Sequence, residues 1–184
     1  RGGADVGEEL ILAKDLIGNV LRNHVEIIEE FPGSQLEGMS YLPLFPGAVS
    51  RGKSDSAWTI VTADFVTTTD GTGVVHTAVM YGEDDYRLGI DVGFPAQHTV
   101  GMDGAFVSGV HDLLDGRYVK ECDNDIIDIL DTNGVLYREH EYTHDYPHCW
   151  RTDHPLLYYA MDSWFVRMTA VREQIISHNS SVQW

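Results

Sequence analysis

The stretch "VTTTDGTGVVHTAVMYGEDDY", residues 66–86, combines a tight-turn signal with the start of a helix. Asp70-Gly71 lies between two β-type runs, which predicts a hairpin with residues 66–69 and 74–77 as its arms. Side chains alternate along a strand, so Thr67 and Thr69 are expected on one face and Thr68 on the other. The acids of 83–85 are typical of a first helical turn, and Gly93 is a plausible helix end. We therefore expect a hairpin followed by a short helix.

Outward from this stretch, the chain alternates β-type runs with short helical patterns. Apolar spacing predicts a helix over 14–24, and the stretch 123–134 predicts another, with Asp123 as a candidate N-cap and Gly134 as a candidate terminator. A closing helix is expected over 169–179. Runs rich in β-branched and aromatic residues predict strands at 9–13, 25–31, 57–68, 134–150, 155–161 and 163–168. The sequence thus predicts an α+β, β-dominated fold, a strongly twisted sheet or barrel with peripheral helices. With no repeat or linker, residues 1–184 are expected to form a single domain.

Composition narrows the class of protein. The 184 residues are 43% hydrophobic, which suits a globular core, and no apolar run is long enough for a membrane span. Two cysteines form no disulfide framework, so a reducing, cytoplasmic setting is the expectation. The net charge of -17 argues against a surface that grips a phosphate backbone with Lys and Arg.

The residues alone leave the chemistry of 66–86 open. His76 can offer a donor, an acceptor or a steric wall, but a strand histidine is most often structural. Asp85 could anchor an ammonium group or simply stabilise the start of a helix. A rival reading is a zinc-dependent hydrolase, because imidazole and thiolate groups that suit zinc crowd one segment: His140, His144, His148, Cys149 and His154. The aromatic residues and Pro147 in that segment favour strand or turn, in which those side chains would scatter.

Several motifs together resemble one known domain. "ILAKDL", "LEGMSYLPLF", "DGTGVVHTA", "YGEDDYRLGIDVGFP", "DGRYVKECDNDIIDIL", "YPHCWRTDHPLLYYAMDSWFV" and "VQW" occur in the order seen in the editing domain, connective peptide 1, of isoleucyl-tRNA synthetases. The likeness covers nearly the whole chain. Leucine enzymes typically carry methionine in place of His76 and valine enzymes lysine, so the resemblance points to the isoleucine branch.

This resemblance implies hydrolysis of valine wrongly attached to tRNA(Ile), and of valyl-adenylate. The residue matching Asp85 holds the α-ammonium of the amino acid, and the one matching His76 shapes the pocket; both are the expected catalytic-site residues. Neighbouring residues would contact substrate: Val75, Thr77, Ala78, Tyr81 and Asp84. No metal or cofactor is expected for editing, whereas the full-length enzyme ligates isoleucine to tRNA with ATP and magnesium. The expected partners are the 3′ acceptor end of tRNA(Ile) carrying valine, valyl-adenylate and the remainder of the synthetase, with no membrane.

The chain also departs from the family pattern. The family's Thr-rich motif is expected about twenty residues before "ILAKDL", and this sequence begins after that point, so the activity of the chain alone stays open. A non-catalytic module that only binds the tRNA acceptor end is therefore an alternative. Val79 stands where the family usually has proline, and Thr152 where many relatives carry a second cysteine that contributes to a zinc site.

Overall fold

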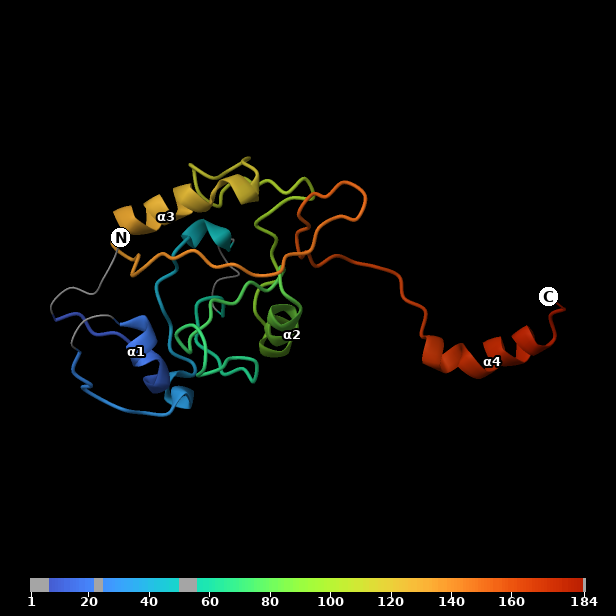
Figure 1. Cartoon of the computed structure of the whole chain (residues 1–184), viewed down its shortest axis with the longest axis horizontal. Helices are drawn as coiled ribbons and strands as arrows, with labels where there is room; N and C mark the ends of the chain where they lie inside the picture. The colour runs from blue at the N-terminus through green and yellow to red at the C-terminus, as the bar shows by residue number, and fades with distance from the viewer. Residues whose placement is uncertain (1–6, 22–24, 50–55, 184) are drawn as a thin grey trace.

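The computed structural model describes residues 7–21, 25–49 and 56–183. In the described chain the α-helices are α1 (Ile17–Val20), α2 (Glu83–Val92), α3 (Asp123–Thr132) and α4 (Met168–Ser180). Short 3-10 turns lie at Lys14–Leu16, Gly33–Leu36, Pro46–Ala48 and Val119–Glu121. Long extended and looped segments connect these elements (Figure 1).

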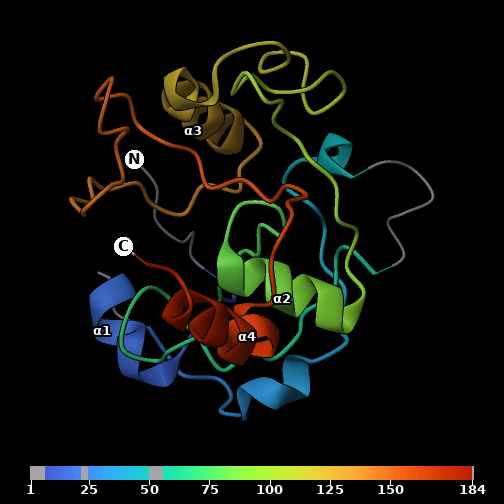
Figure 2. The same ribbon diagram turned by 90° about the vertical axis from the view of Figure 1, so that its right-hand side faces the viewer.

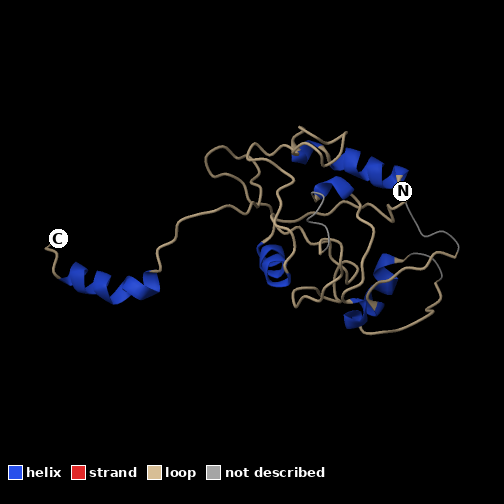
Figure 3. Ribbon diagram, turned by 180° about the vertical axis from the view of Figure 1, so that it is seen from behind, coloured by secondary structure: helices blue, strands red, loops and turns tan. Residues whose placement is uncertain are grey.

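The prediction of a β-dominated sheet or barrel is wrong. Over the described residues, strand-type pairing is confined to four isolated antiparallel bridges, and no sheet forms (Figure 3). These bridges join Ser40 to Thr59, Val100 to Phe106, Ala105 to Tyr118 and His148 to Pro155. The arms of the predicted 66–77 hairpin likewise form no strand.

The physical reason lies in what β-propensity measures. A β-branched run fits a pleated, half-buried surface, and it becomes a strand only where a neighbour supplies a hydrogen-bonding edge. In the 25–31 run, Ile27 and Ile28 are 51% and 69% exposed, so neither is buried in the described structure as a strand in a sheet core would be. Near 40 and 59, pairing lasts for only a few bonds, such as Tyr41 N–H to the Trp58 carbonyl at 3.0 Å.

Helices α2, α3 and α4, in contrast, occur close to where they were predicted. Of the helix predicted over 14–24, the structure forms the 3-10 turn at Lys14–Leu16 and α1, Leu21 is already extended, and 22–24 lie outside the described residues. Helix α2 has Glu83, Asp84 and Asp85 in its first turn, and it ends at Gly93, whose φ of 77° is left-handed. The N–H of Phe94 closes the end on the Gly89 carbonyl at 2.7 Å. Helix α3 begins one residue earlier than predicted, because Cys122 is its N-cap and Asp123 is already helical.

The main core cluster lies under α3. Leu114, Cys122 and Ile129 are buried together, with partly buried apolar side chains packed against them from Phe45, Phe106 and Ile126. Leu16 and Val20 are buried near the N-terminal end of the chain.

Helix α4 stands apart from the rest of the molecule at the end of an extended segment (Figure 1), and in the end-on view of Figure 2 it projects in front of the body. It covers the helix predicted over 169–179. Trp164 and Phe165, in the segment before it, are almost fully exposed. The single-domain assignment for 1–184 stays a prediction. In the described ranges, no helix has the length and apolar character needed to cross a membrane.

Candidate functional site

The candidate site forms where residues 74–82 lead into α2. Before it, the turn at 70–73 places Gly71 and Gly73 at φ of 65° and 78°, which glycine adopts without a Cβ penalty. The turn docks on the N-terminal segment, since Ala13 N–H donates to the Thr72 carbonyl at 2.8 Å. Thr69 Oγ1 lies 3.3 Å from Thr67 Oγ1, so these two hydroxyls share a side as their alternation predicts.

Asp85 is the half-buried acid of the first turn of α2. Its carboxylate accepts a hydrogen bond from the backbone N–H of Ala78, so it bridges the helix and the preceding segment. Burial raises the pKa of Asp85, the Ala78 hydrogen bond lowers it, the charge of Asp84 raises it and the nearby His76 lowers it. His76 itself is exposed. The structure thus brings Asp85, Ala78 and His76 together at one partly desolvated anionic position.

Two glycines allow this close arrangement. A Cβ on Gly82, the N-cap of α2, would overlap the carboxylate of Asp85. A Cβ on Gly89 would lie 2.7 and 2.8 Å from the two methyl groups of Val79. The absence of side chains at both positions lets residues 78–82 lie flat against α2.

An aromatic group fixes the other side of the segment. The hydroxyl of Tyr81 accepts the N–H groups of Thr99 and Val100 at 2.7 and 2.8 Å. The His98 ring stacks on Tyr159 with 4.0 Å between centroids, and both rings meet Tyr81 edge-on. Nδ1 of His98 is buried and has no hydrogen-bond partner among the residues that the structure describes. Burial is the main cause that raises the pKa of Tyr159, whose hydroxyl donates to the Val100 carbonyl at 3.1 Å.

The remaining predicted substrate-contacting residues are less closely tied to Asp85. Val75 is 54% exposed, Asp84 is exposed and Thr77 is half-buried. Tyr81 directs its hydroxyl to the backbone of 99–100, which makes it a support for the segment. Sequence reasoning missed Gly82, and also His98 and Tyr159. For Gly82, the available signal was a glycine directly before three helix-start acids.

The histidines and the cysteine that suggested a zinc site lie along an extended segment and in a tight turn. Cys149 closes this turn through its N–H to the His154 carbonyl at 2.8 Å. A hydrogen bond from the Thr152 side chain, assisted by the N–H groups of Arg151 and Thr152, lowers the pKa of the Cys149 thiol. Among the described residues, no three or more His, Cys, Asp or Glu side chains are grouped so that they could hold a metal ion. These side chains do not form a ligand set there.

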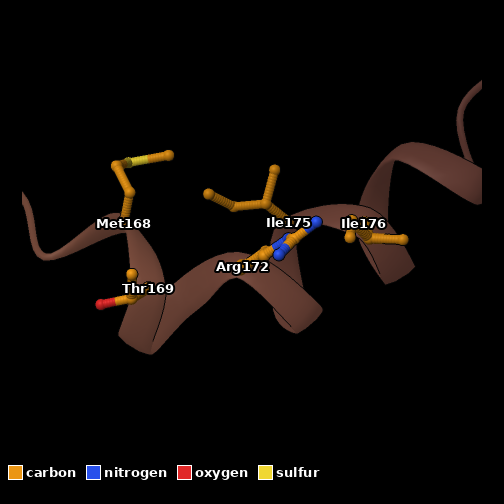
Figure 4. Close-up of a pocket in the computed structure, with 5 residues that line it drawn as sticks. All are labelled: Met168, Thr169, Arg172, Ile175 and Ile176. Atoms are coloured by element: carbon orange, nitrogen blue, oxygen red, sulfur yellow. The ribbon is translucent and has the colours of Figure 1, made fainter.

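A shallow depression lies on α4, away from Asp85. Met168, Thr169, Arg172, Ile175 and Ile176 line it, and all five come from the same helix (Figure 4). Their chemistry is mostly apolar, with one guanidinium and one hydroxyl. The five lining residues include no acid and no nucleophilic thiol.

Comparison with known proteins finds relatives that are isoleucine–tRNA ligases. The chain is 46% identical over 178 residues to the isoleucine–tRNA ligase of Clostridium novyi, covering 97% of this chain and 17% of that protein. It is 44% identical to the enzyme of the same name from Clostridium tetani and 41% identical to that of Bacillus thuringiensis, over 96% and 97% of this chain. The chain thus spans about a sixth of the length of these relatives. No family model matches it.

Proposed function

We propose that this chain, which is homologous over nearly its whole length to one segment of isoleucine–tRNA ligases, is the part of such a ligase that removes wrongly attached valine. The observation that carries the proposal is the Asp85 carboxylate. It is half-buried, lies beside His76 and is held by the Ala78 N–H at the start of a helix. The intact enzyme would join isoleucine to tRNA.

The chemical need for a second site follows from the size of the amino acids. Valine lacks a single methylene of isoleucine, and a hydrophobic pocket gains only about 1–3 kcal/mol of discrimination from that group. A ligase that selects isoleucine in one step therefore charges some tRNA with valine. A second site that admits valine and excludes isoleucine corrects this product.

Asp85 suits the recognition of an aminoacyl group. An α-ammonium is a cation with three donors, and a carboxylate with reduced solvent contact accepts them in charge-assisted hydrogen bonds. The N–H of Ala78 already donates a hydrogen bond to the Asp85 carboxylate, so this bond would orient the carboxylate before substrate arrives. His76, exposed beside it, would form the wall that limits the length of the side chain.

The proposed reaction is ester hydrolysis. Water adds to the carbonyl carbon of valine, the bond from that carbon to the ribose oxygen breaks, and the ribose oxygen takes up a proton. The terminal ribose hydroxyl of the tRNA would assist the water, so no general base from the protein is required. In valyl-adenylate, water would add to the same carbonyl carbon, the bond from that carbon to the phosphate oxygen would break, and valine and AMP would be released.

No cofactor takes part in this proposed step. ATP and magnesium would serve the ligation step in the rest of the enzyme. The proposed partners are the valylated 3′ end of tRNA(Ile), valyl-adenylate and the remainder of the ligase.

The test is hydrolysis by the ligase that contains this chain. Purified Val-tRNA(Ile) and Ile-tRNA(Ile) are incubated with the enzyme without ATP, and release of each amino acid is followed. We expect rapid loss of valine and retention of isoleucine. Equal, slow loss of both would contradict editing and leave acceptor-end binding as the role of the segment.

A further inference from the structure

Four aromatic rings lie at every second position along residues 142–148. Tyr142 and His144 are stacked with 5.5 Å between centroids and 24° between planes. His144 then meets Tyr146, and Tyr146 meets His148, edge-on at 5.9 and 6.0 Å. Alternate side chains of an extended chain point the same way, so the four rings form one continuous row. We refer to them as the aromatic ladder.

The ladder is both accessible and held in place. Tyr142 is 71% exposed, and both histidines are exposed. The Tyr146 hydroxyl donates to the Leu156 carbonyl at 2.7 Å. Nδ1 of His148 lies 3.0 Å from the Tyr146 carbonyl. Tyr142, His144 and His148 are thus open to solvent, while backbone contacts hold the rings of Tyr146 and His148.

Charge differs between the two sides of this segment. Nζ of Lys120 lies 4.2 Å from the centroid of the Tyr146 ring, which places a cation on the ladder. The acids of the segment, Glu139, Glu141 and Asp145, occupy the odd positions of the alternation. The ladder side thus combines aromatic faces with a positive charge, and the carboxylates alternate away from it.

The ladder also connects to the candidate site. Leu156 N–H pairs with the Pro147 carbonyl at 3.0 Å, and Ala160 N–H pairs with the Met80 carbonyl at 2.9 Å. Tyr159 lies edge-on to Tyr81, 5.9 Å between centroids. The 156–160 segment thus runs from the base of the ladder to the residues that precede Asp85.

We propose that the aromatic ladder is a stacking surface for the single-stranded 3′ end of a tRNA, an inference that rests on the proposed editing function. A chain with a net charge of -17 is poorly suited to hold nucleic acid through its phosphates. Stacking of bases on aromatic rings needs no excess of basic residues and tolerates any sequence. The ladder would supply this contact at one end of the 156–160 segment, whose other end pairs with Met80 in the stretch before Asp85.

The experiment uses the ligase that contains this chain. Tyr142→Ala/His144→Ala is expected to raise KM for Val-tRNA(Ile) deacylation about 5- to 100-fold, the range for loss of base stacking, with little change in kcat. Tyr142→Phe/His144→Phe should restore KM, because the aromatic faces return. The matched control is Glu141→Ala/Thr143→Ala on the alternate side of the same segment, which should leave KM unchanged.

A binding measurement separates this inference from the editing proposal. Fluorescence anisotropy is measured with an acceptor-stem minihelix that carries no amino acid, once with its single-stranded 3′ nucleotides and once without them. The alanine pair should weaken binding only of the form with the single strand, and the salt dependence should not change, because no phosphate contact is lost. If the enzyme with the alanine pair binds the single-stranded form as tightly as the unsubstituted enzyme does, the proposed role of the aromatic ladder is overturned, even if valine is still hydrolysed. An enzyme that hydrolyses no Val-tRNA(Ile) but shows this binding difference would overturn editing alone.

Discussion

At Gly82 the backbone lies against the carboxylate of Asp85 so closely that no side chain fits between them. The φ and ψ of Gly82, -145° and 144°, suit any residue, so alanine would cause no backbone strain. The carboxylate, at the end of a short flexible side chain, would move instead.

We therefore predict that Gly82→Ala lowers Val-tRNA(Ile) deacylation by about tenfold to a hundredfold, as small displacements of positioning groups do. The melting temperature should change little. Gly18→Ala is the control, because a Cβ there meets nothing within 4 Å. Full deacylation activity in Gly82→Ala would show that the position of the carboxylate is not critical.

The ionised carboxylate of Asp85 should lower the stability of the folded protein at neutral pH. Burial raises its pKa above the ordinary 3.8, so in the range just above that value the folded protein binds more protons than the unfolded chain. Stability from this group therefore falls as pH rises through the folded pKa, and the cost disappears below about pH 3.8.

Asp85→Asn removes this charge while its amide oxygen can still accept the Ala78 N–H. We expect a higher melting temperature than the unsubstituted chain at pH 7, with the difference shrinking towards pH 3.5. Thermal denaturation across that range measures it. A lower melting temperature for Asp85→Asn at pH 7 would contradict this reading of the site.

At the scale of elements, Tyr81 joins the segment before α2 to residues 99–100. Tyr81→Phe would leave the N–H groups of Thr99 and Val100 without their acceptor. We predict a loss of about 1–3 kcal/mol in the free energy of unfolding, measured by urea denaturation. Tyr86→Phe, 41% exposed on α2, serves as the control and should cost far less. Similar stability of both variants would mean that Tyr81 does not hold this segment.

Local patterns predicted the helices because a helix is closed by bonds within itself. Three acids and Gly93 mark α2, and the stretch 123–134, with Asp123 at its start and Gly134 at its end, marks α3. The strands could not be predicted in this way, since a strand needs a partner distant in sequence. The 25–31 run has the right composition, yet its isoleucines remain exposed.

The candidate site likewise combines contacts between residues close in sequence with contacts between distant residues. Asp85 and Ala78 are seven positions apart, so a turn into a helix brings them together and sequence reasoning could anticipate it. His98 and Tyr159 reach Tyr81 from 17 and 78 positions away, and nothing in the local pattern predicts that contact. The alternation of rings along 142–148 was visible in the sequence, but their accessibility required the structure.

At the scale of the whole molecule, charge limits how this chain meets tRNA. With 29 acidic and 12 basic side chains, it has little capacity to release counterions from a phosphate backbone. We predict that the isolated 184-residue chain barely retards tRNA in an electrophoretic assay at physiological salt. A submicromolar dissociation constant under those conditions would contradict stacking at a flexible 3′ end as the main contact.

The central claim is that Asp85 and His76 recognise a misattached valine. The most direct measurement is deacylation of Val-tRNA(Ile) and Ile-tRNA(Ile) by the ligase carrying Asp85→Ala or His76→Ala, with melting temperature as the folding control. Loss of a charge-assisted hydrogen bond, about 1.5–3 kcal/mol, predicts a roughly tenfold to hundredfold slower release of valine in Asp85→Ala. His76→Ala should begin to release isoleucine, because the wall beside Asp85 is shortened. Full valine release by Asp85→Ala, or complete retention of isoleucine by His76→Ala, would contradict the account.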